Sequence, residues 1–521
     1  MKKRIISLML MPVLAISLLA GCGDSGQKEG NVSSSKTTEQ SSSKTNTPEG
    51  DSLEEVNIKL VTINTKTEDF DDVMNKVKAL VKEKVNANLD VEVWDWAEWG
   101  DKYPLAFASG EAIDLIYAAN WTNYTQYAAQ DGYYKLTKEM IQQYAPNSWN
   151  CYTEAEWERS KINGDYYIIP NGERVCANPV TMALIRGDLR EKHNIPEVTD
   201  WDSYVNYMEA IAEKENSILA YNCGAGNGGA NALLGAILWD EGYNLLNNMC
   251  GIAIDMNASI ESGKPVYVDV LEDEAFMNAY KQIAEWRKKG LWSQSAMSND
   301  ISVQTAFTNG ASASLFESSW AIGTTYATVT ESHPEWKIEA IELFPDRTLY
   351  ENEFLTSGYA VHANSKNPER ALMVMDLLRH DEEIHNLLTY GIEGVHYEFV
   401  GEDSYINLNG KSFSLDMGLH NGSRRVADSW CDVAKDQVKK IATEMVTTPY
   451  TLFNFDTTPV TTEYAALTAV VSEYYPILRD GFAEDVEATF KEFRQKAEDV
   501  GLNKVLDEYK AQLAAYMETS K

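Results

Sequence analysis

The sequence predicts a doubly wound α/β protein, in which mostly parallel sheets carry helices on both faces. The first observation is an early alternation of apolar β-branched runs with helix-period patterns, which indicates parallel strands joined by helical crossovers. The second is length: about 470 of the residues follow a polar leader, enough for two sizeable domains. The third is a set of polar and aromatic residues at predicted strand ends, where this class binds its ligands.

Residues 1–21 have the pattern of an export signal. A positive head, Lys2-Lys3-Arg4, precedes an apolar run over 5–20 that is shorter than the roughly 20 residues of a membrane-spanning helix. The run ends in Leu-Ala-Gly-Cys, a lipobox, in which the Cys22 thiol takes a diacylglyceryl group and becomes the first mature residue. We therefore expect a lipoprotein, anchored through Cys22 to the outer face of the cytoplasmic membrane.

Residues 22–53 are predicted to form a disordered tether. Ser, Thr, Gly, Lys, Glu and Gln dominate this stretch, which has no aromatic residue and a single branched aliphatic one, Val32, before Asp51. Such a composition cannot bury enough apolar surface to offset the entropy of ordering. The folded part is expected to span 54–521, with two lobes interleaved in sequence, on a leash of about 30 Å.

The formal net charge of −34 argues against nucleic acid as a ligand, because nucleic-acid binding requires a basic footprint. Cysteine usage leaves two alternatives open. Beyond Cys22 the chain has Cys151, Cys176, Cys223, Cys250 and Cys431, with no CxxC pair. Export permits disulfides, but an odd count leaves one thiol free unless it pairs with another molecule, so both buried thiols and one or two bridges remain possible.

The first lobe is predicted from a βαβαβ pattern. Strands are expected over 56–64, 89–94 and 114–119, and helices over 70–85 and 96–109. Parallel strands end at one edge of their sheet, where a ligand of this fold class sits. We therefore expect Asn64, Trp94, Asp95 and Trp121 to line a ligand site.

A second lobe is predicted to begin with strands over 166–170 and 179–186. The chain is then expected to return to the first lobe with a buried strand over 312–316, which places Glu317 and Trp320 beside the ligand. Helices are predicted over 188–193, 201–214, 231–239, 274–289, 368–379 and 382–390, with a further strand over 354–362. An apolar stripe from Val486 to Val500 predicts a helix near the C-terminus.

The 13 Trp and 28 Tyr residues favour a carbohydrate ligand, because several of them lie at predicted strand ends or in loops. An aromatic face can stack on the C–H patch of a sugar while neighbouring Asp, Glu and Asn side chains bond its hydroxyls. Other aromatic residues are expected in the core, as is Trp286, which lies within a helix.

Motifs for catalysis or metal binding are not found. Gly224–Gly229 matches GxGxxG, but it lacks the surrounding Rossmann half and the acidic residue that a dinucleotide site needs, so we predict a loop. His380 and His385 are five apart, about 140° around a helix, and do not form a metal pair. There is no HExxH, GxSxG or Walker loop. We expect a binding protein without metal or cofactor. A lipid-anchored glycoside hydrolase is the alternative from another class.

Three blocks of sequence resemble a known family. The run Ala108–Tyr117 (ASGEAIDLIY), followed by Tyr127–Gly132 (YAAQDG) and Leu136, is similar to the early block of family 1 extracellular solute-binding proteins of ABC importers. Ala363–Ala371 (ANSKNPERA) with Tyr390–Tyr397 (YGIEGVHY) resembles the LipO-like branch of that family. Its C-terminal extension of unassigned function is matched by FDTTPV, from Phe455, and the helices after it.

This resemblance implies a two-lobed, hinge-closing fold of the periplasmic-binding-protein type II. It also implies a function: delivery of a solute, usually a sugar or oligosaccharide, to ABC permease subunits in the membrane. The ligand contacts carried over are Trp121, Trp320, Tyr359 and Glu393. We expect a monomer, and a peptide or other organic solute is the alternative ligand within the binding class.

Overall fold

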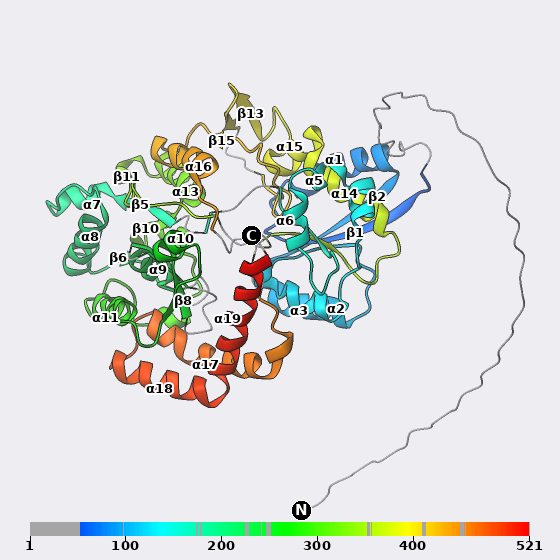
Figure 1. Ribbon diagram of the computed structural model, residues 1–521. Helices are drawn as coiled ribbons and strands as arrows, with labels where there is room; N and C mark the ends of the chain where they lie inside the picture. Colours follow the sequence, from blue (N-terminus) through cyan, green and yellow to red (C-terminus); the bar gives the residue numbers. More distant parts are fainter. Residues whose placement is uncertain are drawn as a thin grey trace, which may run out of the picture. The chain divides into compact units, whose positions relative to one another are not determined.

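The computed structural model describes residues 53–519 apart from short gaps, and these residues lie within one compact unit of the chain, residues 47–521 (Figure 1). The gaps are residues 97, 173–175, 178–179, 225–228, 241, 246–251, 352–354, 356, 409–412, 449–452 and 454. The predicted signal peptide, the lipidation site Cys22 and the predicted tether up to residue 52 lie outside the described residues.

A five-stranded sheet organises the first lobe, with strand order β2-β1-β3-β12-β4. Its strands are β1 (Val56–Ile63), β2 (Ala87–Trp94), β3 (Leu115–Tyr117), β4 (Ile168–Pro170) and β12 (Gly358–Val361). β1 and β2 pair in parallel from Val56 opposite Ala87 to Ile63 opposite Trp94, and β3 is parallel to β1. The three strands predicted for the start of the chain are therefore confirmed.

Alternate residues of these strands enter two separate cores, because successive side chains of a strand point to opposite faces. Leu60 and Leu115 pack into one core, whereas Val61 and Ile116 pack into the other. The helices of the first core are α1 (Phe70–Val85), α14 (Pro368–His380) and α15 (Glu382–Tyr390), and those of the second are α2 (Trp99–Ala108) and α3 (Tyr124–Ala129). Helices therefore cover both faces of this sheet, as predicted.

α1 shows how local sequence makes these elements. Its buried residues recur at spacings of three and four between Phe70 and Val85, which forms one apolar stripe facing the sheet. Acidic residues occupy its first turn and lysines its last, which complements the helix dipole. The helix ends at Asn86, whose φ of 47° lies in the left-handed region that closes many helices.

A four-stranded sheet organises the second lobe, with strand order β11-β5-β10-β6. Its strands are β5 (Val180–Arg186), β6 (Leu219–Tyr221), β10 (Ser312–Ser318) and β11 (Ile338–Glu342). Its helices include α7 (Gly187–Lys192), α8 (Trp201–Lys214), α9 (Asn231–Asp240), α10 (Met256–Ser262), α11 (Glu274–Lys288), α12 (Val303–Thr308), α13 (Ser319–Ser332) and α16 (Asp432–Glu444). Trp286 of α11 is buried in the core of this lobe, as predicted.

Two predictions about these sheets are wrong. The strand predicted over 312–316 does not return the chain to the first lobe, because β10 pairs with β5 and β6 of the second sheet, and the return is made by β12. The sheets are also mixed and not mostly parallel: β12 is antiparallel to β3 and β4, and β5 is antiparallel to β10 and β11. A strand that enters from the other lobe is not joined by a helical crossover, so nothing forces it to run parallel.

Two segments that link the two sheets run together, and the segment after α16 pairs beside them. Cys176 forms an antiparallel bridge with Glu351, and Tyr350 a parallel bridge with Val446. The amide of Glu351 donates to the carbonyl of Val446 at 3.0 Å, and the Thr447 hydroxyl donates to the Glu351 carboxylate at 2.7 Å. These backbone and side-chain bonds join the segments beside the place where the chain passes between the sheets.

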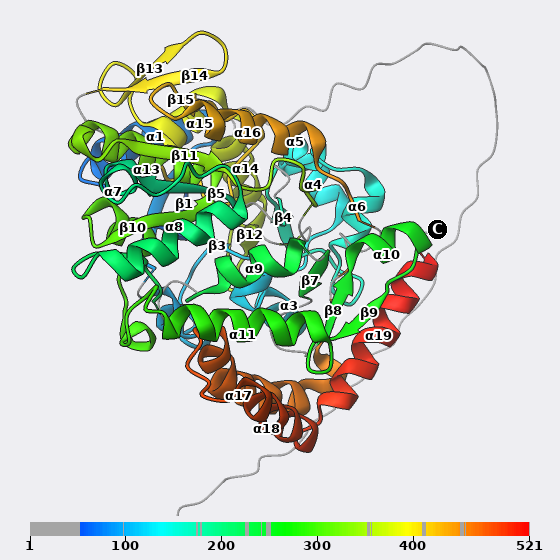
Figure 2. The ribbon, with the colours of Figure 1, turned by 90° about the vertical axis from the view of Figure 1, so that its left-hand side faces the viewer.

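The C-terminal helices pack on the second lobe. They are α17 (Thr461–Arg479), α18 (Val486–Asp499) and α19 (Leu502–Thr519), and α18 carries the predicted apolar stripe. α17 and α18 contact α11, as Figure 2 shows, and α19 contacts α17 and α18. This segment therefore extends the core of the second lobe and does not form a separate one.

Smaller elements complete the described part of the chain. Two three-stranded sheets are formed by β7 (Tyr243–Leu245), β8 (Ile252–Asp255) and β9 (Tyr267–Asp269), and by β13 (Tyr397–Val400), β14 (Ser404–Asn407) and β15 (Val426–Ala427). Short helices of the first lobe are α4 (Lys138–Tyr144), α5 (Pro146–Trp149) and α6 (Glu154–Arg159).

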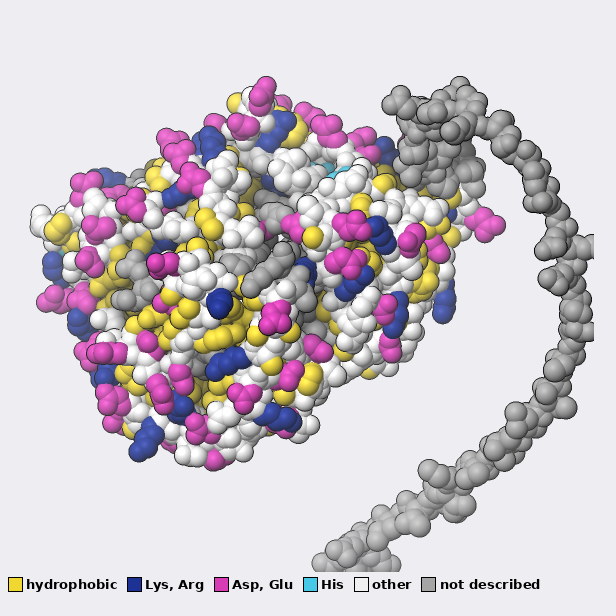
Figure 3. Space-filling model, in the orientation of Figure 1, with side chains coloured by type: hydrophobic (Ala, Val, Ile, Leu, Met, Phe, Trp, Pro, Cys, Tyr) yellow, Lys and Arg dark blue, Asp and Glu magenta, His cyan; other side chains and the backbone are white. Residues whose placement is uncertain are grey.

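The visible surface agrees with the acidic composition of the chain, and several of its cysteines are free thiols. Figure 3 shows Asp and Glu side chains spread over the visible face, with Lys and Arg among them. Cys151, Cys223 and Cys431 are free thiols, and Cys250 lies outside the described residues. Within the described ranges, no helix combines the length and the apolar character needed to cross a bilayer.

Candidate ligand-binding site

The parallel register of β1 and β2 brings Asn64 and Asp95 to the same edge of the first sheet. The Asn64 amide donates to the Trp94 carbonyl at 3.0 Å and so extends the ladder by one residue. Thr65 joins the two, because its hydroxyl donates to the Asp95 carboxylate at 3.1 Å and its amide donates to the Asn64 side-chain oxygen at 2.8 Å. The expected placement of Asn64 and Asp95 at one edge is confirmed, and both carry acceptors suited to hydroxyl groups.

Beside these polar residues lies a cluster of aromatic rings, here called the aromatic platform, made of the exposed Trp96 and Trp121, the half-buried Trp99 and the buried Tyr117. The rings of Trp96 and Trp121 stack with centroids 6.0 Å apart and an interplanar angle of 24°. Trp99 meets Trp121 edge-on at 5.2 Å, and Tyr117 lies 5.4 Å from it. Trp96 is 50% and Trp121 41% exposed, so both rings leave apolar surface in water at the strand edge, where a ligand can reach it.

Local backbone structure turns these rings outward. Helix α2 starts at Trp99, later than the predicted start at Trp96, because the amides of Glu98 and Trp99 both donate to the carbonyl of Asp95. Trp96 is thereby held in a turn. Trp121 lies in a 3₁₀ turn over Asn120–Thr122, which the Thr122 hydroxyl closes by accepting from the Ala119 amide at 3.0 Å.

Two of the predicted ligand contacts are core residues in this structure. Trp94 is 3% exposed, and its indole N–H donates to Glu92 at 2.6 Å. Tyr359 is 1% exposed, its hydroxyl donates to Thr62 at 2.8 Å, and burial raises its pKa. Both side chains point into a packed face of the sheet and cannot touch a solute there. Trp94 and Tyr359 are therefore corrected to structural residues.

The second lobe presents Glu317 and Trp320 at the end of β10. The Glu317 carboxylate is half-buried and accepts from the Ser318 amide at 3.0 Å, and burial raises its pKa. Trp320 stands in the first turn of α13, half-buried. The guanidinium of Arg424 covers its ring, with Cζ 3.9 Å from the centroid, and Trp430 meets it edge-on at 4.9 Å. Trp320 is therefore less available for stacking than the platform.

The carboxyl end of β6, which is parallel to β10, adds residues that sequence analysis did not single out. Asn222 accepts from Asn299 at 2.9 Å and donates to the carbonyl of Ile301 at 2.9 Å. Ile301 is 49% and Met297 43% exposed, so this edge also shows apolar surface to water. Nothing in local periodicity predicts it, because the pairing of Asn222 with Asn299 spans 77 residues.

Glu393 lies apart from these groups. It is exposed in the turn after α15, where it forms a bridge with Tyr397 of β13. Across the described ranges no hydrogen bond, ion pair or ring contact links it to the other predicted site residues. The two histidines considered above also contact residues outside the predicted site. His380 Nε2 lies 3.8 Å from the Cys151 sulfur, and His385 Nε2 lies 3.4 Å from the Thr389 hydroxyl. Among the residues that the structure describes, no group of three or more His, Cys, Asp or Glu could hold a metal ion.

Two α/β sheets linked by paired chain crossings, each presenting strand ends with polar and aromatic groups, define a two-lobed solute-binding protein of type II. The chain belongs to the bacterial extracellular solute-binding protein family, whose sequence profile matches residues 64–383, more than half of the chain. A second profile, Domain of unknown function (DUF3502), matches residues 449–518, which contain α17, α18 and most of α19.

Relatives support this assignment. A Carbohydrate ABC transporter substrate-binding protein of Streptococcus pneumoniae serotype 4 is 22% identical over 479 residues, or 89% of this chain and 91% of the relative. The crystal structure of the N-glycan transport solute binding protein NgtS from Streptococcus pneumoniae has a TM-score of 0.71 at 20% identity, over 90% of this chain and 100% of that one. Its complex with Man5GlcNAc has a TM-score of 0.69, also at 20% identity and with the same coverage. These likenesses establish the fold.

Proposed function

We propose that this protein captures a carbohydrate, in particular an oligosaccharide, and delivers it to the permease subunits of an ABC importer. The observation that carries the proposal is the aromatic platform at the carboxyl edge of the first sheet. Stacked, half-exposed indole rings next to Asn64 and Asp95 combine flat apolar faces with hydroxyl acceptors, which is the chemistry that a sugar ring requires.

In this proposal the first lobe supplies Trp96, Trp99 and Trp121 for stacking. The second lobe supplies Glu317 for hydrogen bonding and Trp320, with Arg424 on its ring, as a partly polar wall. Glu393 is not included, because it bridges Tyr397 of β13 and that bridge connects it to neither strand edge. The carbohydrate-binding names of the pneumococcal relatives support the ligand class, although at about one residue in five identical they do not specify the sugar.

The extracellular solute-binding family and the ABC transporter name of a relative support the proposal that the protein acts outside the cell as a carrier and not as an enzyme. We further propose that Cys22 carries the lipid anchor, that the polar stretch after it forms the tether, and that the protein acts as a monomer. The segments at Cys176 and Tyr350, which connect the two sheets, are proposed as the hinge, with Val446 bonded beside them, since closure needs segments that can rotate where the chain passes between lobes.

Calorimetric titration of the purified protein tests the ligand class. The panel contains mannose-, glucose- and N-acetylglucosamine-based oligosaccharides of two to seven residues, and a set of short peptides. We expect at least one oligosaccharide series to bind, with affinity rising with chain length as more rings reach the platform. Binding of a peptide with no response to any glycan would replace the carbohydrate proposal by a peptide carrier.

A further inference from the structure

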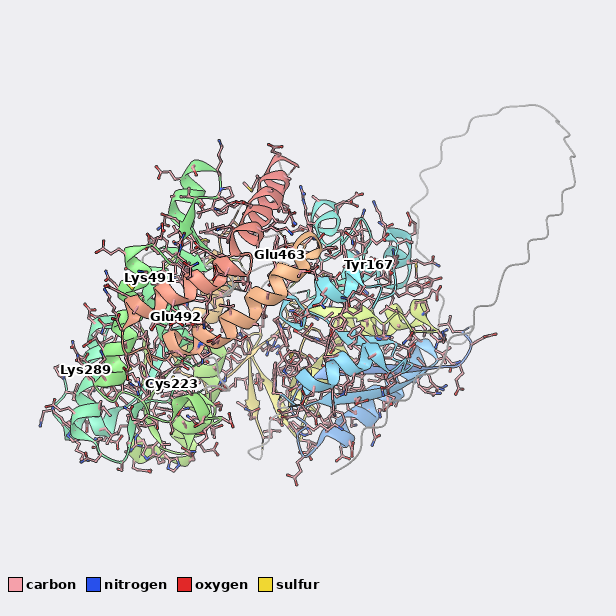
Figure 4. The ribbon with its side chains drawn as sticks, turned by 90° about the horizontal axis from the view of Figure 1, so that it is seen from below. Tyr167, Cys223, Lys289, Glu463, Lys491 and Glu492 are labelled. Atoms are coloured by element: carbon pink, nitrogen blue, oxygen red, sulfur yellow. The ribbon has the colours of Figure 1, made fainter. Side chains whose placement is uncertain are left out.

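The C-terminal end of helix α17 packs close to the carboxyl end of β6, where Asn222, Asn299 and Ile301 form what is here called the ligand edge of the second lobe. Arg479 and Asp480 form an ion pair with two contacts of 2.7 Å, and Asp480 is fully buried. Removing either partner would leave the other as an uncompensated buried charge. Figure 4 shows α17 running from Glu463 at its N-terminal end toward Cys223, which follows β6.

Asp480 binds the chain where helix α9 begins. One carboxylate oxygen accepts from the Ala230 amide at 3.0 Å, an orphan donor at a helix N-terminus that favours a negative partner. Gly229 precedes it with φ +58°, and a Cβ there would lie 1.9 Å from the same oxygen. Only glycine permits this approach, because both the backbone angle and the space exclude a side chain.

Two further bonds hold the same junction. The Tyr475 hydroxyl of α17 donates to the Asn231 side-chain oxygen at 2.6 Å, and the Trp292 indole donates to the Asp480 carbonyl at 3.1 Å. On the strand side, the Gly229 amide donates to the Gly224 carbonyl at 2.9 Å, which ties the start of α9 to the end of β6.

The junction leads directly to the ligand edge. Cys223 lies between Asn222 and Gly224, and its carbonyl accepts from Asn299 at 3.1 Å. Its thiol is buried, and burial together with the neighbouring Asp480 carboxylate raises its pKa. Only a few bonded residues therefore separate Asp480 from Asn222 and the exposed Ile301.

We propose that Asp480, aided by Tyr475, is a positioning residue for the solute-binding edge of the second lobe. The C-terminal helices, which match a domain of unknown function, thereby act as a brace of the binding site. The inference rests on the proposed function in one respect, since it predicts that a segment outside the solute-binding profile sets ligand affinity.

The test compares Asp480→Asn and Tyr475→Phe with a matched control, Arg494→Gln. Arg494 of α18 also anchors the extension, through ion pairs with Asp269 and Glu272 at 3.2 and 2.9 Å, but it does not touch the ligand edge. Each full-length variant is measured for the Kd of the tightest glycan, for melting temperature, and for the labelling rate of Cys223 by iodoacetamide, read by mass spectrometry of the peptide that contains it.

We expect a Kd at least fivefold weaker for Asp480→Asn and about threefold weaker for Tyr475→Phe, with faster Cys223 labelling in both. Arg494→Gln should keep the wild-type Kd and labelling rate even if its melting temperature falls. Wild-type affinity in Tyr475→Phe and in folded Asp480→Asn would overturn the inference. If the wild type binds no glycan, the proposed function fails, and the brace is then decided by the labelling rate alone: an unchanged rate in both variants overturns it.

Discussion

The guanidinium of Arg424 lies over the ring of Trp320, with Cζ 3.9 Å from the ring centroid. The same guanidinium pairs with the buried carboxylate of Asp416 through Nε at 3.2 Å. Although burial opposes it, Arg424 and His420 hold the pKa of Asp416 well below its usual range. One face of Trp320 is thus occupied by a charged group that is itself fixed.

Trp320→Ala is expected to reduce stability more than affinity. The substitution removes the contacts with Trp430 and Arg424, and a loss of about 2–3 kcal/mol is expected for a half-buried Trp, below the range for full burial. Urea unfolding and calorimetry measure the two effects. Arg424→Gln is the companion variant, because it uncovers the ring. A tenfold loss of glycan affinity in Trp320→Ala with unchanged stability would show that a sugar displaces Arg424.

Trp121→Ala and Trp96→Ala are expected to weaken glycan binding about tenfold or more, with little change in melting temperature. A stacked aromatic face contributes about 1–3 kcal/mol, by analogy with bases on aromatic side chains, and these exposed rings add little to folding. Trp157→Ala provides the control, since this fully buried ring should cost about 3–5 kcal/mol of stability. Lower melting temperatures with intact affinity in the platform variants would place them in the fold and not in the site.

Acidification is expected to destabilise the protein through His385. Burial lowers the pKa of this ring to about 4, and its Nδ1 has no hydrogen-bond partner among the described residues. An unfolded His titrates near pH 6.5. Between about pH 6.5 and 4 the unfolded state therefore binds more protons than the folded state, and the free energy of unfolding decreases as the pH is lowered. Over this whole pH range the free energy of unfolding decreases by about 3 kcal/mol.

The measurement is urea unfolding at pH 7.5, 6, 5 and 4. His385→Asn should flatten the pH dependence, whereas His333→Asn, at a more exposed site, should not. His380, whose pKa is also lowered to about 4, contributes a similar slope that remains in both variants. Identical pH profiles for the wild type and His385→Asn would contradict this assignment.

A glycan that binds is expected to be returned intact after many hours with the protein. Solute-binding proteins hold their ligand between lobes and release it unchanged, so chromatography should show no shorter products. Product that grows with protein concentration, and that disappears when one Asp or Glu is substituted, would identify a glycoside hydrolase and end the transport proposal.

The wild-type protein is expected to partition with membranes through Cys22. Cys22→Ala should leave the protein in the soluble fraction or unprocessed, because a diacylglyceryl group needs the thiol. Cell fractionation with metabolic palmitate labelling checks both points. Equal membrane association of the wild type and Cys22→Ala, without label in either, would reject the anchor.

Much of the fold was predictable because it depends on local period. The stripes of α1 and α18 and the apolar runs of β1, β2 and β5 are visible in sequence, since a helix or strand repeats its core-facing positions every 3.6 or 2 residues. The edge shared by Asn64, Asp95 and Trp121 followed from the same pattern, because parallel strands place their carboxyl ends together.

The sequence by itself determined the α/β class, the strand ends that carry polar and aromatic groups, and the family. Only the tertiary structure decided which sheet β10 joins, that β12 runs antiparallel, that Trp94 and Tyr359 are buried, and that Arg424 covers Trp320. These features depend on pairs of residues that lie far apart in the chain. A local pattern shows which face of an element is apolar, but the partner of that face is selected by packing across the whole domain.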